Sequence, residues 1–145
     1  MMAIIIALSV VFHLVWENAQ APLYAGYENF WQHFWICLSV IPGDVTITLA
    51  AYFAVAFWRR NMAFVGAMRF SDALATGLCA TLVSVVIEWF SLATGRWAYG
   101  SVMPILPGLG IGLLPVLQMM IIPPVTLYLT GKLMKRCIGK TTFTI

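Results

Sequence analysis

The sequence predicts an all-α protein, an integral membrane four-helix bundle with both termini in the cytoplasm. Hydrophobic residues make up 62% of its 145 residues and charged residues only 9%, whereas a soluble domain is about 45–50% apolar and about 25% charged. Four apolar stretches are each long enough to cross a bilayer. Basic residues gather on one side of these stretches. We therefore expect residues 1–145 to form a single transmembrane domain.

The four apolar stretches give the expected helix bounds, which are about 2–23, 33–58, 73–94 and 110–133. The first stretch has no Lys or Arg before it, unlike a secretory signal peptide, so we expect it to remain as a span. From Tyr99 onward, the link before the last span is apolar and uncharged, yet it is rich in proline and glycine. Residues 99–110 fit either a re-entrant segment that covers a site or a tight turn before a proline-started helix.

The basic residues predict the orientation. Seven of the eight lie in the loop after the second span or in the C-terminal tail, and only Arg96 lies in the link after the third span. This asymmetry places that loop and both termini in the cytoplasm, most simply at the cytoplasmic membrane of a bacterium. The seven are Arg59, Arg60, Arg69, Lys132, Lys135, Arg136 and Lys140.

Aromatic residues near the span ends fit the same orientation. Trp31, Trp35, Trp97 and Tyr99 are expected in the outer interfacial belt, and Trp58 in the inner one.

Three acidic residues fall inside the expected spans and are the candidate catalytic groups: Glu17, Asp44 and Glu88. An ionisable group at the centre of a span costs about 2.5–3.5 kcal/mol on the insertion scale, so such groups are candidates for function. With a rise of 1.5 Å per residue, all three lie in the outer half of the bilayer or near its midplane. Buried acids at one depth are suited to acid–base chemistry.

Further polar and aromatic residues at this depth are the candidate substrate-binding groups. His13 and Gln20 share a helical face with Glu17, and Arg96 follows Glu88 by about two turns and could pair with it. Pro42 and Gly43 precede Asp44, where freed backbone carbonyls could join the site. The full set of candidate binding residues is His13, Gln20, Arg96, Trp97, Tyr99 and Gln118.

Several functional classes find no support in the sequence. There is no phosphate loop, dinucleotide fingerprint, serine nucleophile elbow or zinc helix. The three cysteines are far apart, and the acids and His13 lack the spacing of a metal motif, so we predict no metal site and name no cofactor. The net charge of +3 reflects membrane topology, so no nucleic-acid partner is expected.

Two resemblances rest on particular residues. Trp16-Glu17, Gly43-Asp44, Glu88 and the run Thr94-Gly95-Arg96-Trp97-Ala98-Tyr99 resemble a group of small bacterial four-helix membrane proteins of unknown function. Glu88, Gly95, Trp97, Tyr99, Gly110 and Pro115 are similar to part of the lycopene-cyclase-type membrane domain. That resemblance implies a membrane cavity in which acids protonate a polyene. The family's Pro-x-Glu-Glu element is absent, because the sequence here reads Pro115-Val116-Leu117-Gln118.

These observations favour a membrane protein that binds or transforms a hydrophobic lipid or isoprenoid-like substrate by acid–base chemistry. Trp16, Trp89, Trp97 and Tyr99 could then stack on a polyene or stabilise a carbocation. The alternative is a non-enzymatic subunit or assembly factor of a larger membrane complex, with another membrane protein or a second copy of the chain as partner. Ion conduction is disfavoured because the inner halves of the spans are apolar.

Overall fold

A computed structural model describes residues 1–141, with side chains as far as Arg136. Cys137, Lys140 and the other side chains beyond Arg136, together with residues 142–145, lie outside this description. Its elements are α1 (Met2–Gln20), a short 3-10 helix η1 (Ala21–Leu23), α2 (Phe30–Arg59), a second 3-10 helix η2 (Phe64–Ala67), α3 (Phe70–Ala93) and α4 (Leu113–Thr141).

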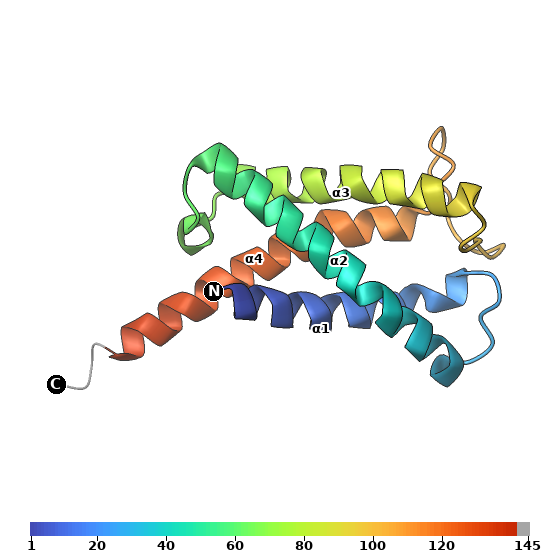
Figure 1. The fold of residues 1–145 in the computed structure, drawn as a ribbon, viewed down its shortest axis with the longest axis horizontal. Coiled ribbons are helices and arrows are strands. Elements are labelled where there is room, and N and C mark those ends of the chain that lie inside the picture. The colour runs from blue at the N-terminus through green and yellow to red at the C-terminus, as the bar shows by residue number, and fades with distance from the viewer. Residues whose placement is uncertain (142–145) are drawn as a thin grey trace.

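The four long helices run alternately up and down and form a closed bundle. α1 packs against α2 and α4, and α3 packs against the same two neighbours (Figure 1). We call the end where α1 and α3 finish and α2 and α4 begin the site end. The N-terminus, the α2–α3 loop and the last turns of α4 lie at the opposite end. All four helices are long and apolar enough to cross a membrane, which confirms the predicted all-α architecture of four apolar helices.

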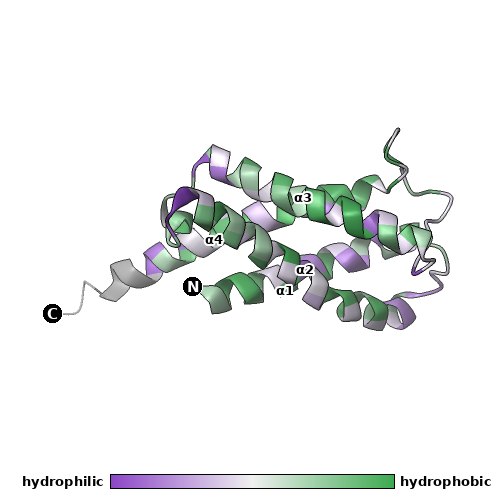
Figure 2. Cartoon of the chain, turned by 45° about the horizontal axis from the view of Figure 1, so that its top comes forward, coloured by the Kyte–Doolittle hydropathy of each residue, from purple (hydrophilic) through white to green (hydrophobic). Residues whose placement is uncertain are grey.

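The surface of the bundle is apolar along its length. Large hydrophobic side chains on every helix are exposed, and Figure 2 shows hydrophilic residues mainly near the ends. In a membrane these side chains would face lipid. The buried apolar core lies toward the opposite end, where α1, α2, η2 and α4 meet around Ile5, Tyr52, Val55, Ala56, Phe64, Val65 and Leu127.

The helix bounds differ from the predicted ones by a few residues, for local reasons. α2 begins at Phe30 because the Asn29 side chain caps it, accepting the Gln32 backbone N–H at 3.0 Å. α4 begins at Leu113, later than expected, because Gly108 and Gly110 have φ values of 81° and 67°, which a helix does not allow.

α3 begins at Phe70, earlier than expected, and includes Asp72, which the sequence placed in a loop. The Asp72 carboxylate is fully buried, accepts the Arg69 backbone N–H at 2.9 Å and lies 3.3 Å from Arg59 Nε. An ion pair thus joins the end of α2 to the start of α3. The opposite half of the bundle is therefore less apolar than predicted.

Proline residues within helices have different effects in α2 and α4. α2 continues through Pro42, and neither Pro42 nor Leu38, whose carbonyl loses its donor, lines the site cavity described below. The prediction that freed carbonyls there join the site was wrong. α4 bends in its middle, where Pro123 and Pro124 remove two successive N–H donors (Figure 1).

Two glycines allow α4 to approach its neighbours closely. A Cβ atom at Gly77 on α3 would lie 2.7 Å from the Met120 carbonyl oxygen, and one at Gly131 on α4 would lie 2.0 Å from the Val65 carbonyl oxygen. No larger side chain fits at either position without moving the backbone.

The link between α3 and α4 lies at the site end of the bundle, beside the end of α3 (Figure 1). The Gly100 N–H donates to the Leu23 carbonyl at 2.8 Å, which ties the link to the end of α1. The Trp89 indole N–H donates to the Leu109 carbonyl at 2.7 Å, which holds the link against α3. Residues 99–110 form no helix and lie at the end of the bundle, an arrangement that favours the turn before the last helix over a re-entrant segment.

Candidate functional site

A cavity of about 250 Å³ lies at the site end, and all four helices contribute to its wall. Glu17 reaches it from α1, Asp44 from α2, Glu88 from α3 and Gln118 from α4. Apolar side chains, among them Ile36, Ile47 and Met119, separate these polar groups. Of the nine residues predicted for the site, seven line the cavity: Glu17, Gln20, Asp44, Glu88, Arg96, Trp97 and Gln118.

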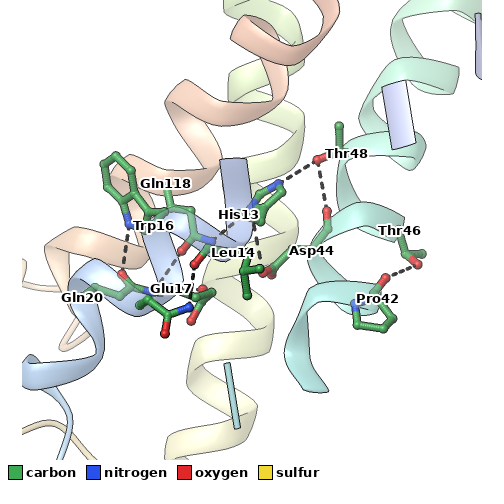
Figure 3. Close-up of polar contacts among 11 residues, drawn as sticks. His13, Leu14, Trp16, Glu17, Gln20, Pro42, Asp44, Thr46, Thr48 and Gln118 are labelled. Carbon is green, nitrogen blue, oxygen red and sulfur yellow. Dashed lines mark hydrogen bonds and ion pairs between the residues drawn. The ribbon is translucent and has the colours of Figure 1, made fainter. Parts of the chain in front are cut away.

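A chain of side-chain hydrogen bonds runs beside the cavity from α1 through α4 and back to α1 (Figure 3). The Trp16 indole N–H donates to Gln20 Oε1 at 3.1 Å. Gln20 Nε2 then donates to Glu17 Oε1 and to Gln118 Oε1, both at 3.0 Å. Gln118 Nε2 lies 3.0 Å from His13 Nδ1, and His13 Nε2 lies 3.1 Å from Thr48 Oγ1.

The direction of this chain follows from Trp16, because an indole N–H can only donate. It turns the Gln20 oxygen toward Trp16 and the Gln20 amide nitrogen toward Gln118. Gln118 must then accept with its oxygen and donate with its nitrogen, so His13 Nδ1 is an acceptor. His13 is therefore the neutral tautomer with the proton on Nε2, which donates to Thr48.

The Asp44 carboxyl receives no hydrogen bond from His13 in this arrangement. His13 Nδ1 lies 3.8 Å from Asp44 Oδ2, a distance that makes an ion pair only if His13 is protonated. Because Nδ1 accepts from Gln118, the two facing atoms are both acceptors. Asp44 Oδ2 is buried and has no hydrogen-bond partner among the described residues. Among the carboxylate oxygens of the cavity residues, this one is both fully buried and without a hydrogen-bond partner in the described part of the chain.

Glu88 is held by the α3–α4 link. Its Oε2 atom accepts hydrogen bonds from the Trp97 indole N–H at 3.2 Å and from the Tyr99 hydroxyl. Burial, followed by the neighbouring Glu88 carboxyl, raises the pKa of the Tyr99 phenol above its usual range, so Tyr99 stays a donor. Trp97 and Tyr99 therefore both orient an acid of the site, and their expected place in the interfacial belt stays a prediction.

Arg96 does not pair with Glu88, contrary to the prediction. Its guanidinium lies 5.2 Å from the centre of the Phe90 ring, in a cation–π contact, and its side chain is exposed at the rim of the cavity. Among the described residues the ion pairs are Arg59 with Asp72 and the conditional contact of His13 with Asp44.

Two aromatic residues expected to stack on a substrate have other partners. Trp16 donates to Gln20, and Trp89 donates to Leu109; neither lines the cavity. Trp31 and Trp35 are largely exposed at the site end, and Trp58 at the opposite end, as an interfacial belt requires.

Sequence reasoning missed four residues of the site: Tyr24, His33, Cys37 and Thr48. The first three line the cavity, and Tyr24 packs against Tyr99 with ring centres 5.6 Å apart. Thr48 could have been found, because it follows Asp44 by one helical turn and so shares its face. Cys37 precedes Asp44 by two helical turns and His33 precedes Cys37 by one, so the same face of α2 could also have pointed to them. Tyr24 could not have been found, since its position depends on how the α1–α2 link folds.

The described residues include no group of three or more His, Cys, Asp and Glu side chains arranged to hold a metal ion. The site is instead a partly apolar cavity with carboxyl groups on three helices. Such a wall can bind a small group of matching shape and exchange a proton with it.

No family model, curated protein or solved structure matches this chain.

Proposed function

We propose that this protein binds the end of a hydrophobic lipid or isoprenoid-like molecule in the cavity and acts on it by acid–base chemistry. The proposal includes the predicted orientation, with both termini in the cytoplasm and the cavity in the outer half of a bacterial cytoplasmic membrane. The observation that carries it is that Glu17, Asp44 and Glu88, from three different helices, line one cavity with an otherwise mainly apolar wall. Carboxyl groups within a membrane are costly and are kept for function.

The three acids differ in what their surroundings allow them to do. Glu88 is fixed by two donors from the α3–α4 link, and Glu17 by Gln20. The Asp44 carboxyl receives no donor in this network, and its side chain is 13% exposed and lines the cavity, so it is the group best placed to exchange a proton with a bound molecule. Asp44 is thus the proposed acid–base group, and Glu17 and Glu88 are the proposed positioning groups.

The volume limits what can bind. A cavity of about 150 Å³ accommodates benzene, so about 250 Å³ holds a group about the size of one substituted ring. The cavity can enclose the end group of an isoprenoid but not a whole polyene. The remaining chain of such a molecule would extend along the apolar surface into lipid.

Native mass spectrometry of the protein in mild detergent tests this proposal. We expect a bound lipid or isoprenoid mass in the wild type and its loss in Glu17→Gln, Asp44→Asn and Glu88→Gln. Glu28→Gln is the matched control, because Glu28 is an exposed acid that does not line the cavity.

A protein that carries no small molecule, or variants that retain it as the wild type does, would refute the proposal. A chain found only with a second protein attached would favour the subunit alternative.

A further inference from the structure

We propose that the group bound in this cavity carries a positive charge and is a hydrophobic amine in its ammonium form. The inference rests on the proposed function, since it concerns the same cavity. It specifies that the hydrophobic end group bound in the cavity carries an ammonium nitrogen.

The charges around the cavity are unbalanced. Glu17, Asp44 and Glu88 line it, and no Lys or Arg forms an ion pair with any of them in the described part of the chain. Arg96 is the basic residue of the wall, but its side chain is exposed and lies over Phe90. Buried carboxyl groups are normally paired or bound to a cation, because burying an unpaired charge is costly.

His13 does not correct this imbalance. Its Nδ1 accepts from Gln118 and its Nε2 donates to Thr48, so the ring is neutral where it faces Asp44. Asp44 Oδ2 therefore stays buried without a donor. An ammonium N–H that reaches the exposed part of the Asp44 carboxyl would supply the positive partner that this group lacks.

The rest of the wall suits an organic cation better than an anion or a metal ion. The aromatic residues Tyr24 and Trp97 offer ring faces of the kind that attract ammonium groups. Ile36, Cys37 and Met119 provide apolar surface for carbon substituents. A metal ion would need several oxygen or nitrogen ligands together, and the described residues include no such group.

Two probes of equal shape test the charge alone. Benzyldimethylammonium is a protonated amine of suitable size, and isobutylbenzene is its neutral analogue, with carbon in place of nitrogen. Each is titrated into the purified full chain in detergent while the tryptophan indole N–H resonances are followed by NMR. The Trp97 resonance, assigned with Trp97→Phe, reports on binding in this cavity.

We expect the ammonium probe to shift the Trp97 resonance and the neutral probe to leave it unchanged. Asp44→Asn should weaken the ammonium affinity about tenfold or more. Glu28→Gln should leave that affinity unchanged, and thermal unfolding of each variant checks its fold. The wild-type comparison of the two probes decides the question even if Asp44→Asn fails to fold.

The outcomes separate this inference from the function on which it rests. If the neutral probe binds with the same affinity as the ammonium probe, the inferred positive charge is wrong, but a hydrophobic ligand is still supported. Binding of the ammonium probe that Asp44→Asn does not weaken would place the charge recognition elsewhere and also overturn the inference. If neither probe binds and no molecule copurifies, both proposals fail.

Discussion

Trp16 does not touch the cavity, yet it sets the state of a residue three hydrogen bonds away. Its donor-only indole fixes Gln20, Gln20 fixes Gln118, and Gln118 makes His13 Nδ1 an acceptor. The sequence could point to His13, Gln20 and Gln118 because polar groups inside spans are rare and costly. It could not give their bonding, since Gln20 and Gln118 are brought together only when α1 packs against α4.

The same limit explains the errors around Glu88. Spacing along one helix predicted Arg96 as its partner, but the chain turns at Gly95, where φ is 66°, and carries the Arg96 side chain over Phe90. Trp97 and Tyr99 reach Glu88 instead. A helical spacing rule holds only as far as the helix does, and α3 ends at Ala93.

We predict that His13 is the neutral tautomer with its proton on Nε2. Two-dimensional nitrogen–proton NMR of the histidine side chains in detergent would give an unprotonated Nδ1 resonance for His13, and His33→Gln would assign it. Trp16→Phe should disturb this tautomer, because Gln20 then becomes free to turn its amide. A doubly protonated His13 ring at neutral pH would contradict the proposed hydrogen-bond direction.

At the scale of the helices, the number and approximate length of the four long helices could be predicted, because apolar stretches of bilayer length are a strong signal. The predicted helix ends differ from the observed ones by several residues where a capping side chain or a glycine of positive φ determines the end, as at Asn29 and Gly110. Gly77 lies where α3 packs closely against α4. A Cβ atom added at Gly77 would lie 2.7 Å from the Met120 carbonyl oxygen, so a larger residue would push the two helices apart.

Gly131→Ala should destabilise the bundle by about 2–3 kcal/mol or more, because its Cβ would meet the Val65 backbone, which cannot turn away as a side chain can. Gly43→Ala is the matched control. Gly43 also lies within a helix but has nothing within 4 Å of an added Cβ, so the change should stabilise by about 0.5–1 kcal/mol.

Reversible unfolding in mixed micelles with increasing denaturing detergent would measure both changes. Equal stability of the two variants would mean that α4 and η2 do not pack as closely as described.

At the scale of the whole molecule, the bundle separates two kinds of interior. Apolar packing around Tyr52 and Leu127 lies toward the opposite end, and the cavity with its carboxyl groups lies at the site end. The opposite end also contains a buried ion pair between Arg59 and Asp72, which joins α2 to α3. The apolar packing at the opposite end thus stabilises the fold, whereas the buried polar groups and the cavity at the site end reduce its stability.

We predict that the N-terminus, the α2–α3 loop and the C-terminus lie in the cytoplasm. A fluorescent protein fused after Ile145 should fluoresce in cells, and alkaline phosphatase joined after Glu28 should be active, because that enzyme folds only outside the cytoplasm. Replacing Arg59 and Arg60 by Gln should weaken this preference. An active phosphatase fused after Ile145 would reverse the assignment and place the cavity in the cytoplasmic half.

The position of Gln118 on the last helix has a consequence for biosynthesis. Gln118 is the residue that joins His13 to Gln20, and it emerges from the ribosome only after the first three spans. Until then His13 Nδ1 and the Gln20 amide lack the partner that Gln118 provides, in a medium that offers few others. A newly made chain that stops before α4 should therefore be retained by the insertion machinery or degraded, and arrival of the last span completes a membrane-stable protein.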